Sequence, residues 1–172
     1  MRTLLLILII AFAACNPAIE KEVAEPIGAG FFLPEEGEKF VVASDSVTDV
    51  WMRYIEAHNN KDINAIMAMN SDSITIHGPD GAVIEGKENH EMALNAWFPA
   101  ENPNWKVYWA MPYKGVTGGA EWIVAGHEVT LTQEGQKNVQ LHMIDAEIEN
   151  GKVRQFYVYS KDIPKPAKED ME

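Results

Sequence analysis

The spacing of apolar residues changes once along this chain, from a period of about 3.6 residues to a period of 2, close to residue 100. Before this point apolar residues recur three and four positions apart, as on one face of an amphipathic helix. After it they alternate with polar residues, as in half-buried strands. Helices followed by long strands predict an α+β fold, in which about three helices pack on one face of a curved antiparallel sheet.

Three helices are expected in the first half of the chain. Ser44 or Ser46 can cap the first helix, because a serine side chain can accept a hydrogen bond from a backbone N–H of the first turn. A shorter helix begins at Asp62, and a third spans residues 87–98, where Pro99 ends it. The buried stripe of the first helix comprises Val47, Val50, Trp51, Tyr54, Ile55 and His58, and that of the third comprises His90, Leu94, Trp97 and Phe98.

Strands are expected on both sides of the third helix. Residues 73–77 alternate as a short strand, which the turn Gly78-Pro79-Asp80-Gly81 closes. Glycine-containing turn signals separate the later runs, and the pair Asn150-Gly151 is a strong hairpin signal. The later runs are therefore expected to form an antiparallel meander, with strands at residues 105–111, 121–133, 139–149 and 153–160.

The first residues are typical of an export signal. Arg2 precedes an apolar run of nine residues, Leu4 to Phe12, and Ala13-Ala14-Cys15 follows. Nine residues rise only about 13 Å as a helix, well short of the roughly 30 Å hydrocarbon core, so a spanning helix is not expected. The small-small-cysteine ending resembles the signal peptides of bacterial lipoproteins, in which the cysteine is lipidated. This resemblance implies that Cys15 becomes the first residue and holds the protein on the lipid bilayer.

Composition divides the remaining chain into three parts. Residues 15–44, with the lipidated cysteine and several prolines and glycines, are expected to form a tether, although the segment from Phe31 to Val42 is apolar enough to pack on the domain. Residues 45–161 form the domain, and residues 162–172 a solvated tail. Loss of residues 1–14 leaves 13 basic and 26 acidic side chains, a formal charge of −13. Such an acidic chain repels phosphate groups, so nucleic acid is not an expected partner.

Six sequence blocks resemble, in order and spacing, those of the ketosteroid isomerase, SnoaL-like and nuclear transport factor 2-like superfamily. The likeness covers about residues 46–161, and the blocks are MRYIE, KDINAIMAMNSD, IHGPDG, IEGKE, LHMIDAEIENGKV and FYVYSKD. It implies a cone-shaped domain whose interior can hold a small apolar ligand, and a homodimer formed through the outer face of the sheet. The superfamily hosts many reactions and also proteins with none, so the fold alone does not define the chemistry.

The resemblance also implies roles for individual residues. Tyr54 matches the tyrosine that donates a hydrogen bond to the substrate oxygen in ketosteroid isomerases, and Asp145 matches the acid beside it, a carboxyl that apolar surroundings keep neutral. The position of the carboxylate base is occupied by Gly78, which cannot take a proton. Ketosteroid isomerase chemistry by the family's route is therefore not expected. Trp51, His90, Leu94 and Met143 are candidates for the ligand-binding surface of the cone.

Two histidines could replace the missing base, because imidazole titrates near neutral pH. His77 lies on the strand face opposite Ile74 and Ile76, which can be the solvent side, and His127 shares a face with apolar residues. His142 is expected on the outer side of the sheet, opposite Asp145. The five histidines show no close ligand spacing, so no metal site is expected, and no motif for a nucleotide cofactor or a covalent nucleophile occurs.

Two classes of function stay open. The first is a cofactor-free enzyme of isomerase, cyclase or lyase type, in which Tyr54 and Asp145 polarise an oxygen of a small apolar compound and His77 or His127 moves a proton. The second is a non-catalytic ligand-binding or dimeric interaction module of the cell envelope. Asn16 follows Cys15 where the best-known sorting rule places aspartate in lipoproteins kept at the inner membrane, so outer-membrane anchoring is expected.

Overall fold

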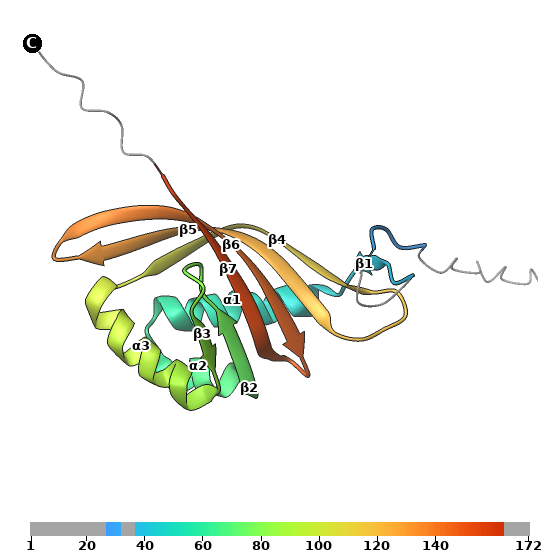
Figure 1. Cartoon of the computed structure of the whole chain (residues 1–172), viewed down its shortest axis with the longest axis horizontal. Helices are drawn as coiled ribbons and strands as arrows, with labels where there is room; N and C mark the ends of the chain where they lie inside the picture. Colours follow the sequence, from blue (N-terminus) through green and yellow to red (C-terminus); the bar gives the residue numbers. More distant parts are fainter. Residues whose placement is uncertain (1–26, 32–36, 164–172) are drawn as a thin grey trace, which may run out of the picture.

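The structure, a computed structural model, describes residues 27–31 and 37–163. In these residues seven strands form one curved sheet, and three helices cover one of its faces (Figure 1). We call the face that packs on the helices the inner face and the opposite face the outer face. The predicted fold class is confirmed.

Helices α1 (Asp45–Asn59) and α2 (Ile63–Met69) begin where the sequence predicted. The hydroxyl of Ser44 accepts a hydrogen bond from the backbone N–H of Ser46, and the carboxylate of Asp62 accepts one from Ala65 at 3.0 Å. Each cap satisfies one of the backbone N–H groups that lack a partner within the helix. These caps fix the residues at which α1 and α2 begin.

Helix α3 (Lys87–Glu101) is longer than predicted, because Pro99 lies inside it. Proline in a helix removes the bond to the carbonyl four residues earlier. Here the helix continues to Asn102, which adopts a left-handed conformation with φ of 40° and donates its backbone N–H to the carbonyl of Phe98. The predicted end at residue 98 is therefore wrong by about one turn.

The sheet has the strand order β1-β4-β5-β6-β7-β2-β3. The predicted antiparallel meander from β4 to β7 is confirmed, whereas β7 also pairs with β2 in parallel. This parallel pair, which lies in the middle of Figure 1, joins the last strand to the strand that follows α2. The strands are β1 (Phe40–Val42), β2 (Asn70–His77), β3 (Val83–Glu85), β4 (Asn104–Gly115), β5 (Glu121–Gln133), β6 (Gln136–Glu149) and β7 (Lys152–Asp162).

Strand β1 extends the sheet ahead of the domain start predicted at residue 45. Val42 pairs with Tyr113 and Phe40 with Gly115 along the edge of β4. Ala29 forms an isolated bridge to Phe40, with hydrogen bonds of 2.8 Å in both directions. The part of the tether that the structure describes therefore packs on the domain, as the apolar segment from Phe31 to Val42 predicted.

The core lies between the helices and the inner face. Ile123, Ala125 and Val129 of β5 are buried there, and Ile144 and Ala146 of β6 pair with β5 in the same layer. Because side chains alternate along a strand, the residues between them lie on the outer face. Residues of even number between 142 and 148 therefore point toward the helices, and those of odd number between 141 and 147 point away.

Candidate functional site

A chain of buried polar side chains crosses the interior between α1, β2 and α3. The hydroxyl of Tyr54 donates a hydrogen bond to Oδ1 of Asn70 at 2.8 Å, and Nδ2 of Asn70 lies 2.9 Å from Nδ1 of His90. An amide nitrogen can only donate, so Nδ1 of His90 accepts and its neutral ring carries the proton on Nε2. The hydroxyl hydrogen of Tyr54 is therefore already used in a hydrogen bond to Asn70, which is 0% exposed.

A second buried pair joins α1 to β5. The indole Nε1–H of Trp51 donates to Nε2 of His127 at 3.1 Å, and both side chains are 1% exposed. Because an indole N–H cannot accept, the neutral ring of His127 carries its proton on Nδ1. In the described part of the chain this Nδ1 is buried and makes no hydrogen bond of good geometry, although the backbone of His142 and of Ala125 lies close enough to oppose the lowering of the pKa of the ring. Such an unpaired buried donor is uncommon in native proteins.

The interior histidines are neutral at pH 7. Burial lowers the pKa of His58 to about 3, although the hydrogen bond to the Tyr54 carbonyl opposes this change. Burial also lowers the pKa of His90 and of His127 to about 4, and for His127 the backbone of His142 partly offsets the lowering. The pKa of Tyr54 is raised by burial. The charged forms of all four groups are disfavoured because the apolar surroundings solvate charge poorly.

Asp145 does not join this interior group. It lies on the outer face of β6, where it pairs in register with Tyr157 and accepts a hydrogen bond from the hydroxyl of Tyr113 at 2.8 Å. The predicted position of Asp145 beside Tyr54 is therefore wrong. A shift of one residue in a strand moves a side chain to the opposite face, and the β6 residue in the core at this level is Ile144.

Other predicted site residues divide between the two faces. His77 lies on the outer face, where its ring stacks on Tyr157 with centroids 4.2 Å apart and planes 5° apart. Met143 also lies on the outer face and is 45% exposed. His142 lies on the inner face beside its register partner His127, so its predicted place on the outer side is wrong. Leu94 is buried in the core.

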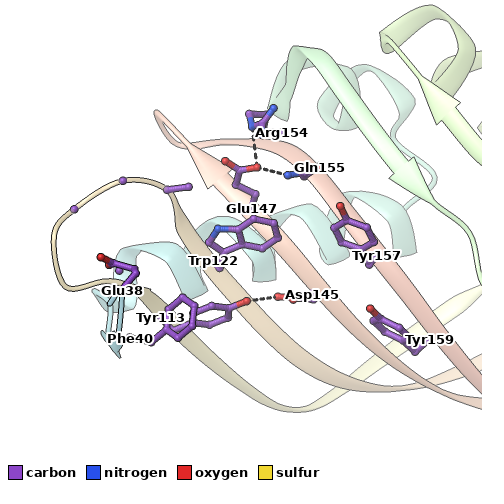
Figure 2. A pocket seen from close by; sticks show the side chains of 14 residues that line it. Glu38, Phe40, Tyr113, Trp122, Asp145, Glu147, Arg154, Gln155, Tyr157 and Tyr159 are labelled. Atoms are coloured by element: carbon purple, nitrogen blue, oxygen red, sulfur yellow. Dashed lines mark hydrogen bonds and ion pairs between the residues drawn. The ribbon is translucent and has the colours of Figure 1, made fainter. Parts of the chain in front are cut away.

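A groove of about 700 Å³ opens on the outer face, between the β1–β4 edge and β7 (Figure 2). Aromatic rings form much of its wall. The rings of Tyr113 and Trp122 stack with centroids 6.4 Å apart, and Phe40 contacts Tyr113 edge-on at 5.5 Å. Tyr157 and Tyr159 line the groove from β7. We call this site the outer groove.

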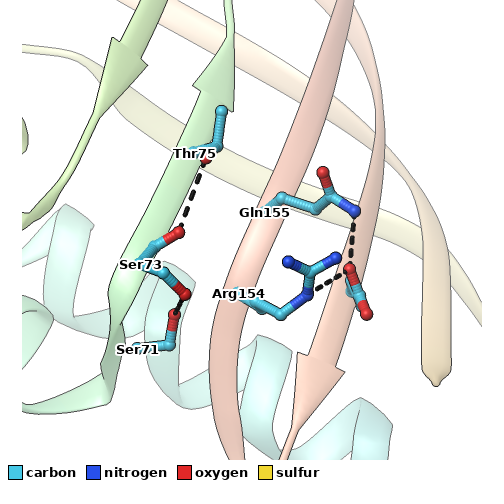
Figure 3. A network of polar contacts seen from close by, with 6 residues as sticks. Ser71, Ser73, Thr75, Arg154 and Gln155 are labelled. Carbon is cyan, nitrogen blue, oxygen red and sulfur yellow. Dashed lines mark hydrogen bonds and ion pairs between the residues drawn. The ribbon is translucent and has the colours of Figure 1, made fainter.

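Three carboxylates also line the outer groove. Oε2 of Glu147 accepts hydrogen bonds from Arg154 Nε at 2.8 Å and from Gln155 Nε2 at 2.6 Å (Figure 3). Two consecutive residues reach one oxygen because a register shift in the pairing of β6 with β7 leaves Arg154 as an extra residue, as in a β-bulge. Glu38 accepts hydrogen bonds from the backbone and the hydroxyl of Thr117.

The third carboxylate, Asp145, is coupled to Tyr113. Burial raises the pKa of Asp145, and the hydrogen bond from Tyr113 opposes this change. Burial and the same hydrogen bond raise the pKa of Tyr113, so its hydroxyl stays protonated and donates. The outer groove therefore combines aromatic walls with two carboxylates, Asp145 and Glu147, that each accept hydrogen bonds on one oxygen only, whereas both oxygens of Glu38 accept from Thr117.

Two features of these sites were not predicted from the sequence. Asn70 is the centre of the interior hydrogen bonds, yet it follows α2 as one polar residue among several. The outer groove is formed by residues far apart in the chain, but alternation in β6 and β7 offered a signal. Asp145 and Glu147 lie on the same face of β6, and Tyr157 and Tyr159 lie on the same face of β7.

Neither a metal centre nor a spanning helix is found in the described residues. The histidines and carboxylates of this part do not gather in a group of three that could hold a metal ion. Among the described helices, none is both long and apolar enough to cross a membrane. Cys15, the predicted lipidation site, lies outside the described residues.

Comparisons with known proteins identify the fold of the chain. No family model matches the sequence, and no curated protein matches it. Among solved structures, a LEH-like epoxide hydrolase from Mycobacterium tuberculosis superposes with a TM-score of 0.60 at 13% identity, over 69% of this chain and 84% of that one. A ketosteroid isomerase-like protein from Erwinia carotovora atroseptica gives a TM-score of 0.54 at 12% identity, over 69% and 95%.

A third solved structure contains a ligand. A Mycobacterium tuberculosis protein in complex with estradiol-17β-hemisuccinate superposes with a TM-score of 0.57 at 14% identity, over 66% of this chain and 92% of that one. Together these likenesses show that the chain has the cone-shaped fold shared by nuclear transport factor 2-like and ketosteroid isomerase-like proteins. The resemblance predicted from the sequence is thereby confirmed for the fold.

Proposed function

We propose that this protein is a lipid-anchored binding domain of the bacterial cell envelope, which takes a small apolar molecule with one oxygen acceptor into the interior of the cone. The anchor would be Cys15, and the ligand would contact His127. The solved complex with a steroid ester supports small-molecule binding in this fold.

The unpaired Nδ1–H of His127 is the observation that carries the proposal. Leaving a buried donor without an acceptor destabilises a protein by about 1–3 kcal/mol. A carbonyl or ether oxygen at this position would remove that penalty and so gain affinity. The other interior donors near it, Trp51 and Tyr54, already have acceptors. A ligand with a single acceptor and an otherwise apolar surface therefore matches the interior best.

Access to His127 requires neighbouring side chains to move, because the residue is 1% exposed. Association that waits for such a movement is slower than docking to an open site. Slow binding is therefore part of the proposal. It separates ligands of the interior from ligands of the open outer groove.

An enzyme of isomerase type is the second candidate, and the likeness to a ketosteroid isomerase-like protein favours it. The geometry opposes it, because Gly78 offers no base, the Tyr54 hydroxyl is committed to Asn70 and Asp145 lies on the other face. A histidine with a pKa of about 4 is a weak base. We expect no turnover of a β,γ-unsaturated 3-ketosteroid, and the absorbance of the conjugated product is the measurement that would detect it. Turnover that is lost when His127 is substituted would show that the protein is an enzyme and would contradict the binding proposal.

Two probes of equal shape test the binding proposal. Cyclohexanone carries a carbonyl oxygen, whereas methylenecyclohexane has a carbon in its place. We expect cyclohexanone to shift the Nδ1 resonance of His127 in nitrogen-15 NMR and to bind about three- to tenfold more tightly than the alkene, the size of one net hydrogen bond.

Variants complete this experiment. His127→Phe should remove the preference for the ketone, while His77→Phe, on the outer face, should leave it unchanged. Equal affinity for the two probes, or an unchanged His127 resonance, would show that Nδ1 is not a ligand contact. If a crystal structure shows an ordered water on Nδ1 and the ketone does not bind, the interior is a packed core and not a ligand site.

A further inference from the structure

We propose that the outer groove binds an organic cation, such as an amine or quaternary ammonium compound with a small apolar body. This site lies on the opposite face of the sheet from His127, so the inference does not depend on the proposed interior ligand. Charge, ring geometry and shape each support it.

The charge of the outer groove is unbalanced. Glu38, Asp145 and Glu147 face one cation, Arg154, among the residues that line the groove. Glu38 is only 6% exposed and Glu147 only 5% exposed. Buried carboxylates in proteins are normally paired with a cation, because an isolated charge is poorly solvated there. The groove therefore holds two more negative than positive side chains.

The single arginine is already committed. Arg154 forms an ion pair with Glu147, at 2.8 Å. Within the described part of the chain, neither Glu38 nor Asp145 takes part in a salt bridge, and their hydrogen bonds come from the neutral groups of Thr117 and Tyr113. A cationic ligand would supply the missing positive charge.

The walls of the groove favour the same class of ligand. The faces of aromatic rings carry negative electrostatic potential and attract ammonium groups, most strongly for tryptophan. Trp122, Tyr113, Tyr157 and Tyr159 surround the carboxylate of Asp145, and Figure 2 shows the Tyr113 hydroxyl directed at it. Rings can also cover the apolar body of the ligand. A strongly hydrated metal ion would not use these walls, and the described residues hold no ligand group of three for one.

The shape of the groove suits a small molecule. Its volume of about 700 Å³ lies within the range of small-molecule pockets, roughly 300–1,000 Å³. Gly118 and Gly119 line the groove, and apart from the residues next to them in the chain nothing would lie within 4 Å of a Cβ placed on either. The groove is therefore open to solvent on this side. Because part of the ligand stays in water, affinity in the micromolar to millimolar range is expected.

Choline and its neutral isostere 3,3-dimethylbutan-1-ol provide the test, because the two differ only in the charged nitrogen. The full chain in a non-ionic detergent is titrated with each by calorimetry, and the indole N–H of Trp122 is followed by NMR. We expect choline to bind with a shift of the Trp122 signal, and the isostere to bind at least about tenfold more weakly.

Variants assign the site. Asp145→Asn keeps the size of the side chain and should weaken choline binding about tenfold, and Trp122→Leu should do the same. Glu128→Gln is the matched control, because Glu128 also accepts a hydrogen bond from a tyrosine, Tyr108, on the same face but outside the groove. It should leave choline affinity unchanged. Thermal unfolding of each variant checks that the fold is kept.

Three results would overturn the inference. Equal affinity for choline and its isostere would make the groove a neutral apolar site. Equal loss in Asp145→Asn and Glu128→Gln would assign the effect to the general negative charge of the protein. Absence of saturable choline binding to the folded wild-type chain, whether the face is free or covered by a second copy, would remove the site.

Discussion

The hydroxyl of Tyr54 and Oδ1 of Asn70 lie 2.8 Å apart in the core, where Asn70 is 0% exposed. Tyr54→Phe removes the donor and leaves Asn70 with an unsatisfied acceptor. We expect the free energy of unfolding, measured in urea, to fall by about 1–3 kcal/mol. Tyr108→Phe removes a tyrosine hydroxyl on the surface and should change it by less than about 0.5 kcal/mol. Equal effects would mean that the interior pair is not shielded from water.

The buried histidines make the protein sensitive to acid. Their pKa values are about 3 for His58 and about 4 for His90 and His127. In the unfolded chain the same groups titrate near 6.5, so the unfolded state binds more protons at mildly acidic pH. Stability is therefore complete above about pH 6.5 and falls as the pH is lowered toward 4.

This loss can be assigned to single residues. Each buried histidine contributes up to about 1.4 kcal/mol per pH unit. His58→Phe keeps an aromatic ring and should reduce the slope of unfolding free energy against pH by the share of one histidine. Urea unfolding between pH 7 and pH 4.5 gives the slopes. Identical slopes for wild type and variant would show that His58 is protonated in the folded state.

The outer face carries large apolar side chains that are half exposed. Trp109, Met111 and Met143 are 48%, 49% and 45% exposed. We expect this face to pair two copies of the chain, because a surface of this kind is normally covered in an oligomer. Met143→Glu should give monomers in sedimentation of residues 16–172. Met52→Glu, at a 44% exposed position on α1, should stay dimeric. A wild-type monomer at tens of micromolar would contradict the expectation.

Lipid anchoring rests on the sequence around Cys15. Cys15→Ala should abolish labelling with a radioactive fatty acid and release the protein from the membrane fraction. Asn16→Asp should keep the label and move the protein to the inner membrane where the common sorting rule holds. Fatty acid labelling of Cys15→Ala that equals wild type would rule out the lipoprotein assignment.

The fold could be predicted because its main signals are local. Caps at Ser44 and Asp62, the change of period near residue 100 and the Asn150-Gly151 turn each act over a few residues. The parallel pairing of β2 with β7 and the attachment of β1 to β4 carry no such signal. They depend on which strand edges remain open once the meander has formed.

The candidate site was harder to predict because it depends on single positions. Asp145 was expected inside the cone, but in a strand a displacement by one residue decides between the two faces, and Ile144 is the residue that faces the core. Tyr54, Trp51 and His127 were placed inside correctly, since each shares a stripe with apolar neighbours. The partner of Tyr54, Asn70, could not be identified from spacing, because it comes from another element.

The parallel contact between β2 and β7 has a consequence for the order in which the molecule can fold. Ile76 of β2 pairs with Phe156, and β3 is joined to the sheet only through β2. Such contacts between distant parts of the chain close a long loop and form late. Until β7 has emerged, β2 and β3 have no sheet to join, whereas α1 can already pack on β4 and β5. The sheet is therefore completed only when β7 is available, and in the exported protein that we propose β2 and β3 would join it only after β7 has passed the export channel.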